Sequence, residues 1–534
     1  MRAHSRILDS LPEFVWLGHS VHRRFEESAR VSVLVNAAIS AAIQVFDLAR
    51  AVEWLESGRS LIWSQVASQR SSLDALVVDS PELAHAVRKV HAELQQLHAG
   101  NRVNVPPPSL DLDSLAGESE AEQYRRAAIR YDKLVKEIRQ REGFEDFLRP
   151  KTFDGIISSP MFARLKATTI FVTVARSSCD ALVLLECGDL KLVKLPELSL
   201  KRVERLRGIW TGGVGLYRAH RGRMASWEVA LLRRCSSIHA LVLGRLWKWI
   251  VHPILDALGL IQDAVREDPL PHIIWCPTGP LTQLPLHAAG IYDQESGGPR
   301  IYDFAVSSYT PSLCAALRCV RDNAEWHSAP SMLFVAQSKT LRTDHPPLPH
   351  VRDESARVRA LMPGPNHTFL EDEQATLAST LAAVDKHPWV HFACHGSQNA
   401  QDPTLSSIEL YDKPLTLTDL MRTVSDNAEL AFLSACETAV GDQKIPEESA
   451  HLAAGMLAVG FKGVVATMWS IRDEDGPVIV DAYYKELLRL RASGTVREGH
   501  TGAPYALHHA VGCLREAVGE TNFERWVPFV HFGV

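Results

Sequence analysis

The sequence lacks the features that mark membrane-spanning, nucleic-acid-binding and disulfide-rich proteins. No apolar run reaches the ~18 residues that a membrane span needs, and the start, Met1 to Arg6, lacks the apolar core of a signal peptide. Basic residues are not in excess: 57 basic and 63 acidic side chains leave a net charge of −6, which gives no electrostatic case for nucleic acid. The nine cysteines are odd in number and scattered, which indicates free thiols in a reducing compartment. We therefore expect a cytoplasmic protein with neither a nucleic-acid nor a membrane partner.

The first 150 residues also lack a clean repeat, although their apolar pattern is helical. One helix is predicted over 37–54 from its apolar spacing. Ser80 is a good N-cap before a proline at the first helical position, and the apolar stripe that follows ends at Gly100. A matching stripe from Tyr124 to Ile138 predicts a second helix that pairs with the first as a hairpin.

The rest of the chain alternates strand-like and helix-like segments, which is typical of an α/β fold. Three short strands are predicted over 170–195, and two long helices over 198–258 follow them. A buried strand is then predicted at His272–Trp275. With 534 residues, the chain has room for two to four domains. We expect an all-helical region over 1–150 and, over 165–534, a mostly parallel sheet flanked by helices.

Two apolar runs in the C-terminal half each lead to a reactive side chain. Trp389–Gly396 (WVHFACHG) contains His395, and Leu430–Thr438 (LAFLSACET) contains Cys436. Such runs suit strands buried on both faces, and the segment between them predicts a short helix. A strand–helix–strand crossover places both carboxyl ends at one edge of the sheet, where open α/β sheets hold their ligands. We therefore expect His395 and Cys436 to lie side by side, although 41 positions separate them.

A cysteine beside a histidine suits nucleophilic catalysis. A thiol becomes a strong nucleophile when a neighbouring base takes its proton, and imidazole has the right proton affinity near neutral pH. A helix that starts after Cys436 would further favour the thiolate. Gly396 has no β-carbon, so the backbone there can approach a substrate closely. The backbone amides of Gly396 and Cys436 are therefore the candidates for an oxyanion hole.

The motifs around these residues resemble those of a known peptidase group. A His-Gly after one apolar strand and an Ala-Cys after the next is similar to the signature of caspase-like cysteine peptidases. The strings HFACHG, LSACETAVGD and VVATMWSIRDEDGP resemble the CHAT family within that group, and the resemblance extends from about Ala167 to Val534. It implies a caspase-like fold, a dyad of Cys436 and His395 without a third acidic member, and a protein substrate.

The same resemblance bears on the helical region. In the CHAT family such helices usually belong to tetratricopeptide repeats, and the segment AVEWLESGRSLIW is similar to the last, degenerate repeat beside fungal CHAT domains. The resemblance thus implies a degenerate tetratricopeptide-like region over 1–150. Helical arrays bind peptides or regulate their neighbours, and they also serve as plain structural support for an adjoining domain. Both roles stay open at this point.

Further residues follow the next predicted strand, Gly463–Met468, whose carboxyl end faces the same edge. Trp469 and Asp473 would form the pocket for the substrate residue just before the cleaved bond, and Asp473 would then favour Arg or Lys. The alternative is that the acids here start a helix and interact with its dipole, which suits Asp475 before Gly-Pro.

Other histidines near these motifs suggest competing roles. His391, Cys394 and His395 hint at a metal, but side chains alternate along a strand, so Cys394 points away from the two histidines and we expect no metal site. We expect Cys394 to be a buried thiol and His391 to be an interior histidine that supports the loop beneath His395. His287, in a turn-rich loop without a following glycine, is a weaker candidate base.

The sequence thus predicts a cysteine endopeptidase that forms an acyl-enzyme at Cys436, with His395 as base and then acid. It needs no cofactor. Its partners would be a protein or peptide substrate and a regulatory protein on the helical region. Two other classes stay open: a caspase-like scaffold in which the dyad is idle, and an α/β domain that binds a small molecule.

Overall fold

The protein is described here by a computed structural model. The described residues are 2–19, 21–59, 61–68, 73–100, 120–149, 151–219, 226–261, 269–293, 297–320, 330–339, 346–399, 402–424, 427–434 and 452–534.

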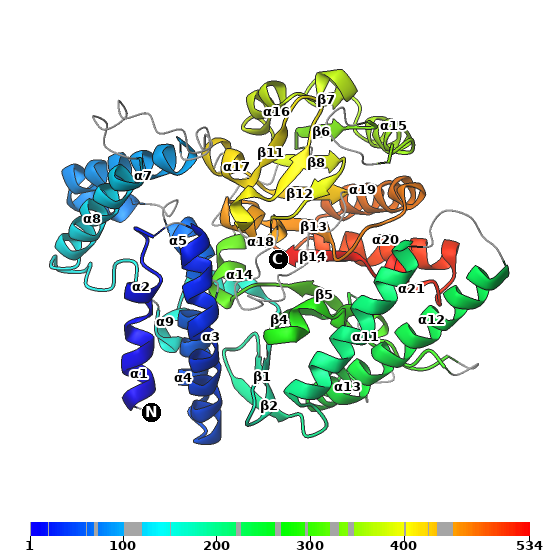
Figure 1. The fold of residues 1–534 in the computed structure, drawn as a ribbon, viewed down its shortest axis with the longest axis horizontal. Helices are drawn as coiled ribbons and strands as arrows, with labels where there is room; N and C mark the ends of the chain where they lie inside the picture. Colours follow the sequence, from blue (N-terminus) through cyan, green and yellow to red (C-terminus); the bar gives the residue numbers. More distant parts are fainter. Residues whose placement is uncertain are drawn as a thin grey trace, which may run out of the picture.

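A single large sheet of eleven strands runs through the α/β part, in the order β3-β2-β1-β4-β5-β14-β13-β12-β8-β6-β7 (Figure 1). Its strands are β1 (Thr168–Val174), β2 (Cys179–Leu184), β3 (Leu190–Lys194), β4 (His272–Pro277), β5 (Val306–Tyr309), β6 (Met332–Ala336), β7 (Thr368–Glu371), β8 (Trp389–Ala393), β12 (Leu430–Ser434), β13 (Gly463–Thr467) and β14 (Phe529–Gly533). The predicted three-stranded meander is therefore confirmed, and β1 joins it to the main sheet by pairing with β4.

Apart from the antiparallel pairings of β2 with β1 and β3, strand direction divides the sheet into two parallel blocks. β1, β4, β5 and β14 run parallel to one another, and β13, β12, β8, β6 and β7 form a second parallel set. The two sets meet at β13 and β14, which pair antiparallel. The carboxyl ends of the two sets therefore lie at opposite edges of the sheet. The mostly parallel sheet is as predicted, whereas this reversal was not.

Helices cover both faces of the sheet (Figure 1). The helices of the α/β part are α11 (Leu200–Ala219), α12 (Ser226–Leu246), α13 (His252–Ala257), α14 (Leu313–Cys319), α15 (Val351–Leu361), α16 (Leu377–Val384), α17 (Leu417–Thr423), α18 (Leu452–Ala458), α19 (Gly476–Ala492), α20 (Ala503–Val518) and α21 (Phe523–Trp526). α15, α19 and α20 pack together in one layer, while α18 contacts α14, α17 and strands β13 and β14 from the other side. A small sheet of β9 (Gly396–Ser397), β10 (Ser407–Glu409) and β11 (Pro414–Thr416) follows β8.

The N-terminal helices were predicted correctly in type, with one break that was missed. They are α1 (Arg2–Asp9), α2 (Leu11–Phe14), α3 (Val21–Gln44), α4 (Leu48–Gly58), α5 (Leu61–Ser68), α6 (Asp74–Asp79), α7 (Pro81–Gly100), α8 (Glu120–Ile138), α9 (Phe153–Ile157) and α10 (Pro160–Leu165). The helix predicted over 37–54 spans two helices, because the Asp47 side chain accepts a hydrogen bond from the Arg50 backbone N–H and caps α4.

Two hydrophobic clusters organise the helical region. The predicted hairpin is present as α7 and α8, whose seam is buried in a cluster of its own that includes Val87, Leu94, Tyr131 and Ile138. Helices α3 to α5 instead share one core with the sheet. Part of the helical region is thus built into the same core as the α/β part.

Hydrogen bonds from Glu56 of α4 and from Arg59, the residue after α4, further join the helical region to the α/β part. The Glu56 carboxylate accepts hydrogen bonds from the backbone N–H groups of Leu313 and Cys314 at 2.7 and 2.8 Å, at the first turn of α14. The buried Arg59 guanidinium donates to the Pro277 carbonyl at 2.7 Å, at the end of β4. Both contacts pair a charged side chain with backbone groups of the α/β part, and Glu56 satisfies N–H groups that have no partner within α14, which stabilises the junction.

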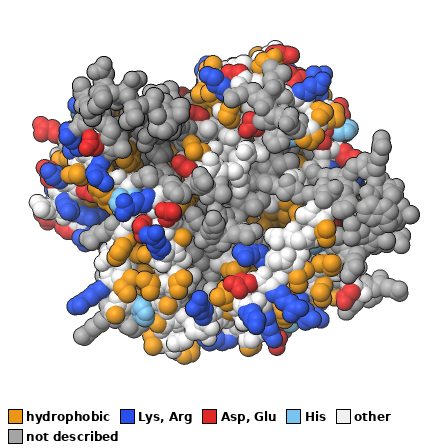
Figure 2. Space-filling model, viewed as in Figure 1, with side chains coloured by type: hydrophobic (Ala, Val, Ile, Leu, Met, Phe, Trp, Pro, Cys, Tyr) orange, Lys and Arg blue, Asp and Glu red, His pale blue; other side chains and the backbone are white. Residues whose placement is uncertain are grey.

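The described surface carries charges of both signs. On the face shown in Figure 2, Lys and Arg side chains are interspersed with Asp and Glu, and apolar side chains occur in small groups. None of the described helices combines the length and the apolar character that a membrane-spanning segment needs.

Candidate active site

Three neighbouring strands, β8, β12 and β13, end at one edge of the sheet. β8 and β12 are parallel and in register, with Phe432 opposite His391 and Ser434 opposite Ala393. Ser434 is two residues before Cys436, and Ala393 is two residues before His395. The crossover topology expected from the sequence is therefore present up to the last described residue of β12. Cys436 itself lies outside the described residues.

His395 is largely buried just beyond the end of β8, with 7% of its surface exposed. Its Nε2 lies 2.8 Å from the backbone carbonyl oxygen of Pro346. A carbonyl oxygen only accepts hydrogen bonds, so Nε2 must carry the proton. In the neutral ring, Nδ1 then carries no proton and is the nitrogen that can act as a base.

Sequence reasoning missed Pro346 as a partner of the histidine. It found no acidic third member for the dyad, and the structure places a backbone carbonyl in contact with His395 instead. Any residue type can supply such a carbonyl, so the side chain at this position carries no signal. The run Pro346-Pro347-Leu348-Pro349 indicates only a stiff segment, because proline fixes the backbone φ angle.

Gly396, the other candidate for the oxyanion hole, begins β9 and is half-buried. It pairs with Ile408 of β10 in the small sheet, and the Glu409 backbone N–H donates to the His395 carbonyl at 2.9 Å. This small sheet therefore holds the backbone on both sides of the His395–Gly396 peptide. Its strands are two or three residues long, which explains why the apolar pattern did not predict them.

Asp473 lies in the turn between β13 and α19. Its carboxylate accepts a hydrogen bond of 2.7 Å from the backbone N–H of His350, the residue that precedes α15. Burial raises the pKa of Asp473, and the His350 N–H opposes that shift. Asp473 therefore lies at the same sheet edge as His395 and is tied to the segment that contacts it, four residues after Pro346.

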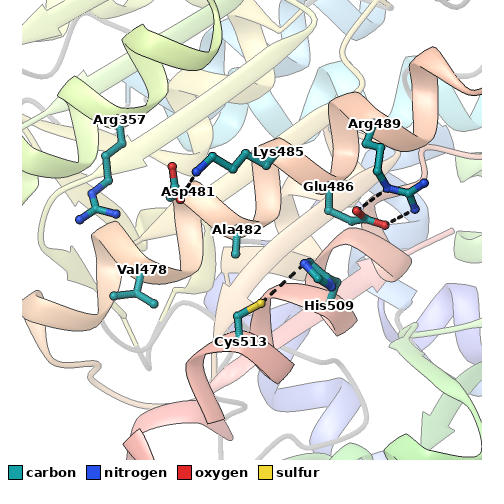
Figure 3. Close-up of a pocket in the computed structure, with 9 residues that line it drawn as sticks. All are labelled: Arg357, Val478, Asp481, Ala482, Lys485, Glu486, Arg489, His509 and Cys513. Carbon is teal, nitrogen blue, oxygen red and sulfur yellow. Dashed lines mark hydrogen bonds and ion pairs between the residues drawn. The ribbon is translucent and has the colours of Figure 1, made fainter. Parts of the chain in front are cut away.

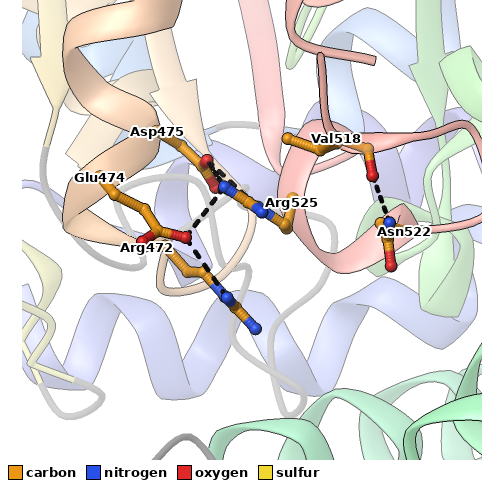
Figure 4. A network of polar contacts seen from close by, with 6 residues as sticks. All are labelled: Arg472, Glu474, Asp475, Val518, Asn522 and Arg525. Carbon is orange, nitrogen blue, oxygen red and sulfur yellow. Dashed lines mark hydrogen bonds and ion pairs between the residues drawn. The ribbon is translucent and has the colours of Figure 1, made fainter. Parts of the chain in front are cut away.

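The two acids after Asp473 pair with arginines (Figure 4). Asp475 is buried, and both of its carboxylate oxygens lie 3.1 Å from Nε of Arg525. Glu474 contacts Arg525 at 2.9 Å and Arg472 at 3.3 Å. Asp475 precedes α19 as expected, but its side chain makes no capping hydrogen bond. The ion pair with Arg525 instead ties the start of α19 to α21.

Trp469, the other predicted pocket residue, is buried with 4% of its surface exposed. Its indole N–H donates to the Glu524 carbonyl at 3.1 Å, and its ring meets Trp210 edge-on at 5.5 Å. These contacts fix the ring between α11 and α21. Its role as a pocket wall stays a prediction.

The remaining candidates near β8 are interior residues. Cys394 is 1% exposed, as expected for a buried thiol. The His391 ring is fully buried, with Nε2 2.7 Å from Glu354 and Nδ1 3.0 Å from the Tyr484 hydroxyl. The predicted interior role of His391 is confirmed. Within the described ranges, no set of three or more His, Cys, Asp or Glu side chains is arranged to hold a metal ion.

His287, the weaker candidate base, lies in the connection between β4 and β5, ten residues after the end of β4. Its two ring nitrogens contact the Tyr309 hydroxyl and the Val527 carbonyl, both at 2.9 Å. Burial lowers the pKa of His287 to about 4, so the ring is neutral near pH 7. These contacts make His287 a structural residue in the β4–β5 connection.

A groove of about 370 Å³ lies away from this edge, between α15, α19 and α20 (Figure 3). Most of its charged side chains pair with one another, as in Lys485–Asp481 at 2.7 Å and Arg489–Glu486 at 2.6 Å. The sulfur of Cys513 lies 3.6 Å from Nε2 of His509 one helical turn earlier. The predicted site residues that the structure describes, His395, Gly396, Trp469 and Asp473, do not line this groove.

Comparisons with known proteins agree with this architecture. The CHAT domain model matches residues 241–534. Separase of Saccharomyces cerevisiae, in its complex with securin, aligns with a TM-score of 0.50 at 11% identity over 93% of this chain and 37% of the separase chain. The Arg-specific cysteine proteinase gingipain R (RgpB) of Porphyromonas gingivalis aligns with a TM-score of 0.36 at 12% identity, over 54% of this chain and 68% of its own. A comparison with the curated proteins finds no match.

The family match covers the described strands at the candidate edge, namely β8, β12 and β13, and more than half of the 534 residues. The separase alignment extends over nearly the whole chain, which includes the helical region. The chain therefore belongs to the CHAT family, and its fold is that of the caspase-like cysteine peptidases.

Proposed function

We propose that the chain is a cysteine endopeptidase in which Cys436 attacks a peptide bond and His395 transfers the protons. Family membership and the parallel register of β8 and β12 support this assignment. The observation that carries it is the contact between His395 Nε2 and the Pro346 carbonyl, because it selects the tautomer in which Nδ1 is the base.

The proposed reaction has two halves. His395 takes the thiol proton of Cys436, and the thiolate adds to the carbonyl carbon of the substrate, whose oxygen gains negative charge and is held by the N–H groups of Gly396 and Cys436. Collapse of this intermediate breaks the C–N bond, and His395 gives its proton to the leaving amine. Water, deprotonated by His395, then releases the acyl group and regenerates the thiol.

Labelling of the purified protein with an iodoacetamide probe at pH 6–7.5 tests this assignment. We expect the fastest labelling at Cys436, because His395, its proposed base, favours the thiolate form of this thiol. Burial raises the pKa of Cys179, Cys314 and Cys319, which should make these thiols slow to react. The Cys436→Ala variant should lose the fast phase, and peptide cleavage with it.

The labelling pattern also separates the other two classes. Equal, slow labelling of several cysteines would favour a scaffold whose dyad is idle. A small molecule that co-purifies in stoichiometric amount, together with slow labelling, would favour a binding domain.

We also propose that Asp473 contributes to a pocket for a basic side chain, as the second part of this function. Its position at the edge where β8 and β13 end supports the idea. A peptide-library cleavage profile should show enrichment of Arg or Lys before the cleaved bond, and Asp473→Asn should reduce that preference by about 10-fold, since an ion pair in a partly buried pocket contributes about 1–2 kcal/mol. Glu474→Gln is the matched control, because Glu474 already pairs with arginines. A profile without basic enrichment would rule out this role.

The helical region is proposed to receive a regulatory protein. Helix α5 packs on α18, which is the first described element after Cys436, and α4 contacts the first turn of α14. A partner bound to these helices would therefore act on α18, the first described helix after Cys436, and on α14, which contacts α18. The same contacts suit a purely supporting role, and a pull-down followed by an activity assay distinguishes the two.

A further inference from the structure

Glu354 is a buried acid that the proposed reaction does not use. It lies in the first turns of α15 with 2% of its surface exposed. One carboxylate oxygen is 2.7 Å from Nε2 of His391 on β8, and the other accepts a hydrogen bond of 3.3 Å from the Ser434 hydroxyl on β12. Burying a carboxylate is costly unless it is paired, so these two contacts constrain its position closely.

The two contacts reach the strands just below the site. His391 is on β8, four residues before His395, which lies just beyond the end of that strand. Ser434 is the last described residue of β12 and lies opposite Ala393 of β8. One carboxylate therefore bridges the ends of the two strands from which the predicted dyad residues follow.

The His391 ring is packed so tightly that it cannot follow a displacement of the Glu354 carboxylate on its own. Its ring is stacked between Phe334 at 4.3 Å and Phe432 at 4.7 Å, with interplanar angles of 12° and 8°. These two residues are its partners in register on β6 and β12. The Tyr484 hydroxyl engages the remaining ring nitrogen at 3.0 Å. A displacement of Glu354 would therefore be transmitted to β8 itself.

A glycine on α19 leaves room for the carboxylate. A β-carbon at Gly476 would come within 2.6 Å of the same Glu354 oxygen that binds Ser434, and within 3.7 Å of the Ser434 hydroxyl. The residues just before α15 contact the site as well, because Pro346 binds His395 and His350 binds Asp473. The start of α15 is thus joined to β8, to β12 and to the turn after β13.

We infer that Glu354 is a positioning residue, which holds the ends of β8 and β12 at the spacing that the His395–Cys436 pair needs. It acts through its contacts with His391 and Ser434. This inference rests on the proposed peptidase function. A misplacement of about 1 Å in such a pair costs roughly 100-fold in rate, so displacement of Glu354 should act on kcat and leave KM unchanged.

Three variants test it in the full-length protein. Gly476→Ala displaces the carboxylate without removing its charge, Glu354→Gln keeps its shape without the charge, and Ser434→Ala removes only the bond to β12. We expect kcat and the rate of Cys436 alkylation to fall about 10- to 100-fold in Gly476→Ala, and less in the other two. In a Glu354→Ala background, Gly476→Ala should have no further effect, because the clash has gone.

Hydrogen exchange of peptides 389–399 and 427–434 is the readout that does not depend on activity. We expect faster exchange there in Gly476→Ala, with matching near-UV circular dichroism to show that the variants are folded. Wild-type exchange and alkylation rates in folded Gly476→Ala and Ser434→Ala would overturn the inference. If the wild-type protein shows neither cleavage nor fast labelling, the proposed function fails, and the exchange rates still decide whether Glu354 holds the two strands together.

Discussion

Replacing His395 by alanine is expected to lower peptide hydrolysis and the alkylation rate of Cys436 by about 10²- to 10⁴-fold, the usual contribution of a positioned general base. Without the imidazole, the thiol must ionise unaided, and no group donates a proton to the leaving amine. Initial rates on a fluorogenic peptide and second-order rate constants for iodoacetamide at pH 6, 7 and 8 measure the two effects separately.

The matched control is His509→Ala, which removes an exposed imidazole on α20. It should leave both rates at the wild-type level. The His395→Ala variant should also keep its circular dichroism spectrum, since one largely buried ring just beyond a strand end contributes little to the core. Equal alkylation rates in His395→Ala and the wild type would refute the role of His395 as the base.

The second large effect concerns stability. Arg491 on α19 and Glu429 just before β12 form an ion pair in which 6% and 2% of the side chains are exposed. Arg491 also donates to the Thr501 carbonyl at 2.9 Å and lies over the Trp389 ring at 4.8 Å. Arg491→Met would leave the Glu429 carboxylate buried without its partner, which typically costs about 3–5 kcal/mol.

Urea unfolding followed by tryptophan fluorescence should therefore show a much lower midpoint for Arg491→Met. The double variant Arg491→Met/Glu429→Gln should recover most of the loss, because no unpaired charge remains. Lys485→Met is the control on the same helix: its pair with Asp481 is exposed, and such pairs contribute about 0–1 kcal/mol. If Arg491→Met and Lys485→Met shift the midpoint equally, the buried pair does not have the importance assigned to it.

Local patterns predicted individual elements well. The helix expected between Ser80 and Gly100 is present as α7, which begins at Pro81 and ends at Gly100. The apolar run at Trp389 became a fully buried strand, because continuous apolar residues suit a strand covered on both faces. Short strands such as β7 and β9 were not predicted, since two to four residues are too few to show a periodic apolar pattern. The helix break at Asp47 was missed because the apolar spacing continues through it.

Local sequence patterns did not predict contacts between segments that lie far apart in the chain. The Pro346 carbonyl and His395 are 49 positions apart, and Glu354 and Ser434 are 80 apart. The first pair involves a backbone oxygen, which every residue has. The second joins a common helix-start acid to a common serine. Glutamate at a helix start and serine at a strand end are both common, so only the contact between Glu354 and Ser434 makes this pair notable.

The amino-acid sequence alone determined where buried strands and helices form, that a histidine and a cysteine follow two of those strands, and that the motifs resemble the CHAT family. Hydrophobic periodicity and capping act over a few residues, so they can be read in this way. The tertiary structure decided the reversal between β13 and β14 and the contacts of Pro346 and Glu354. Those features depend on strand order and on hydrogen bonds across long stretches of chain, and the folded core alone brings such groups within reach of each other.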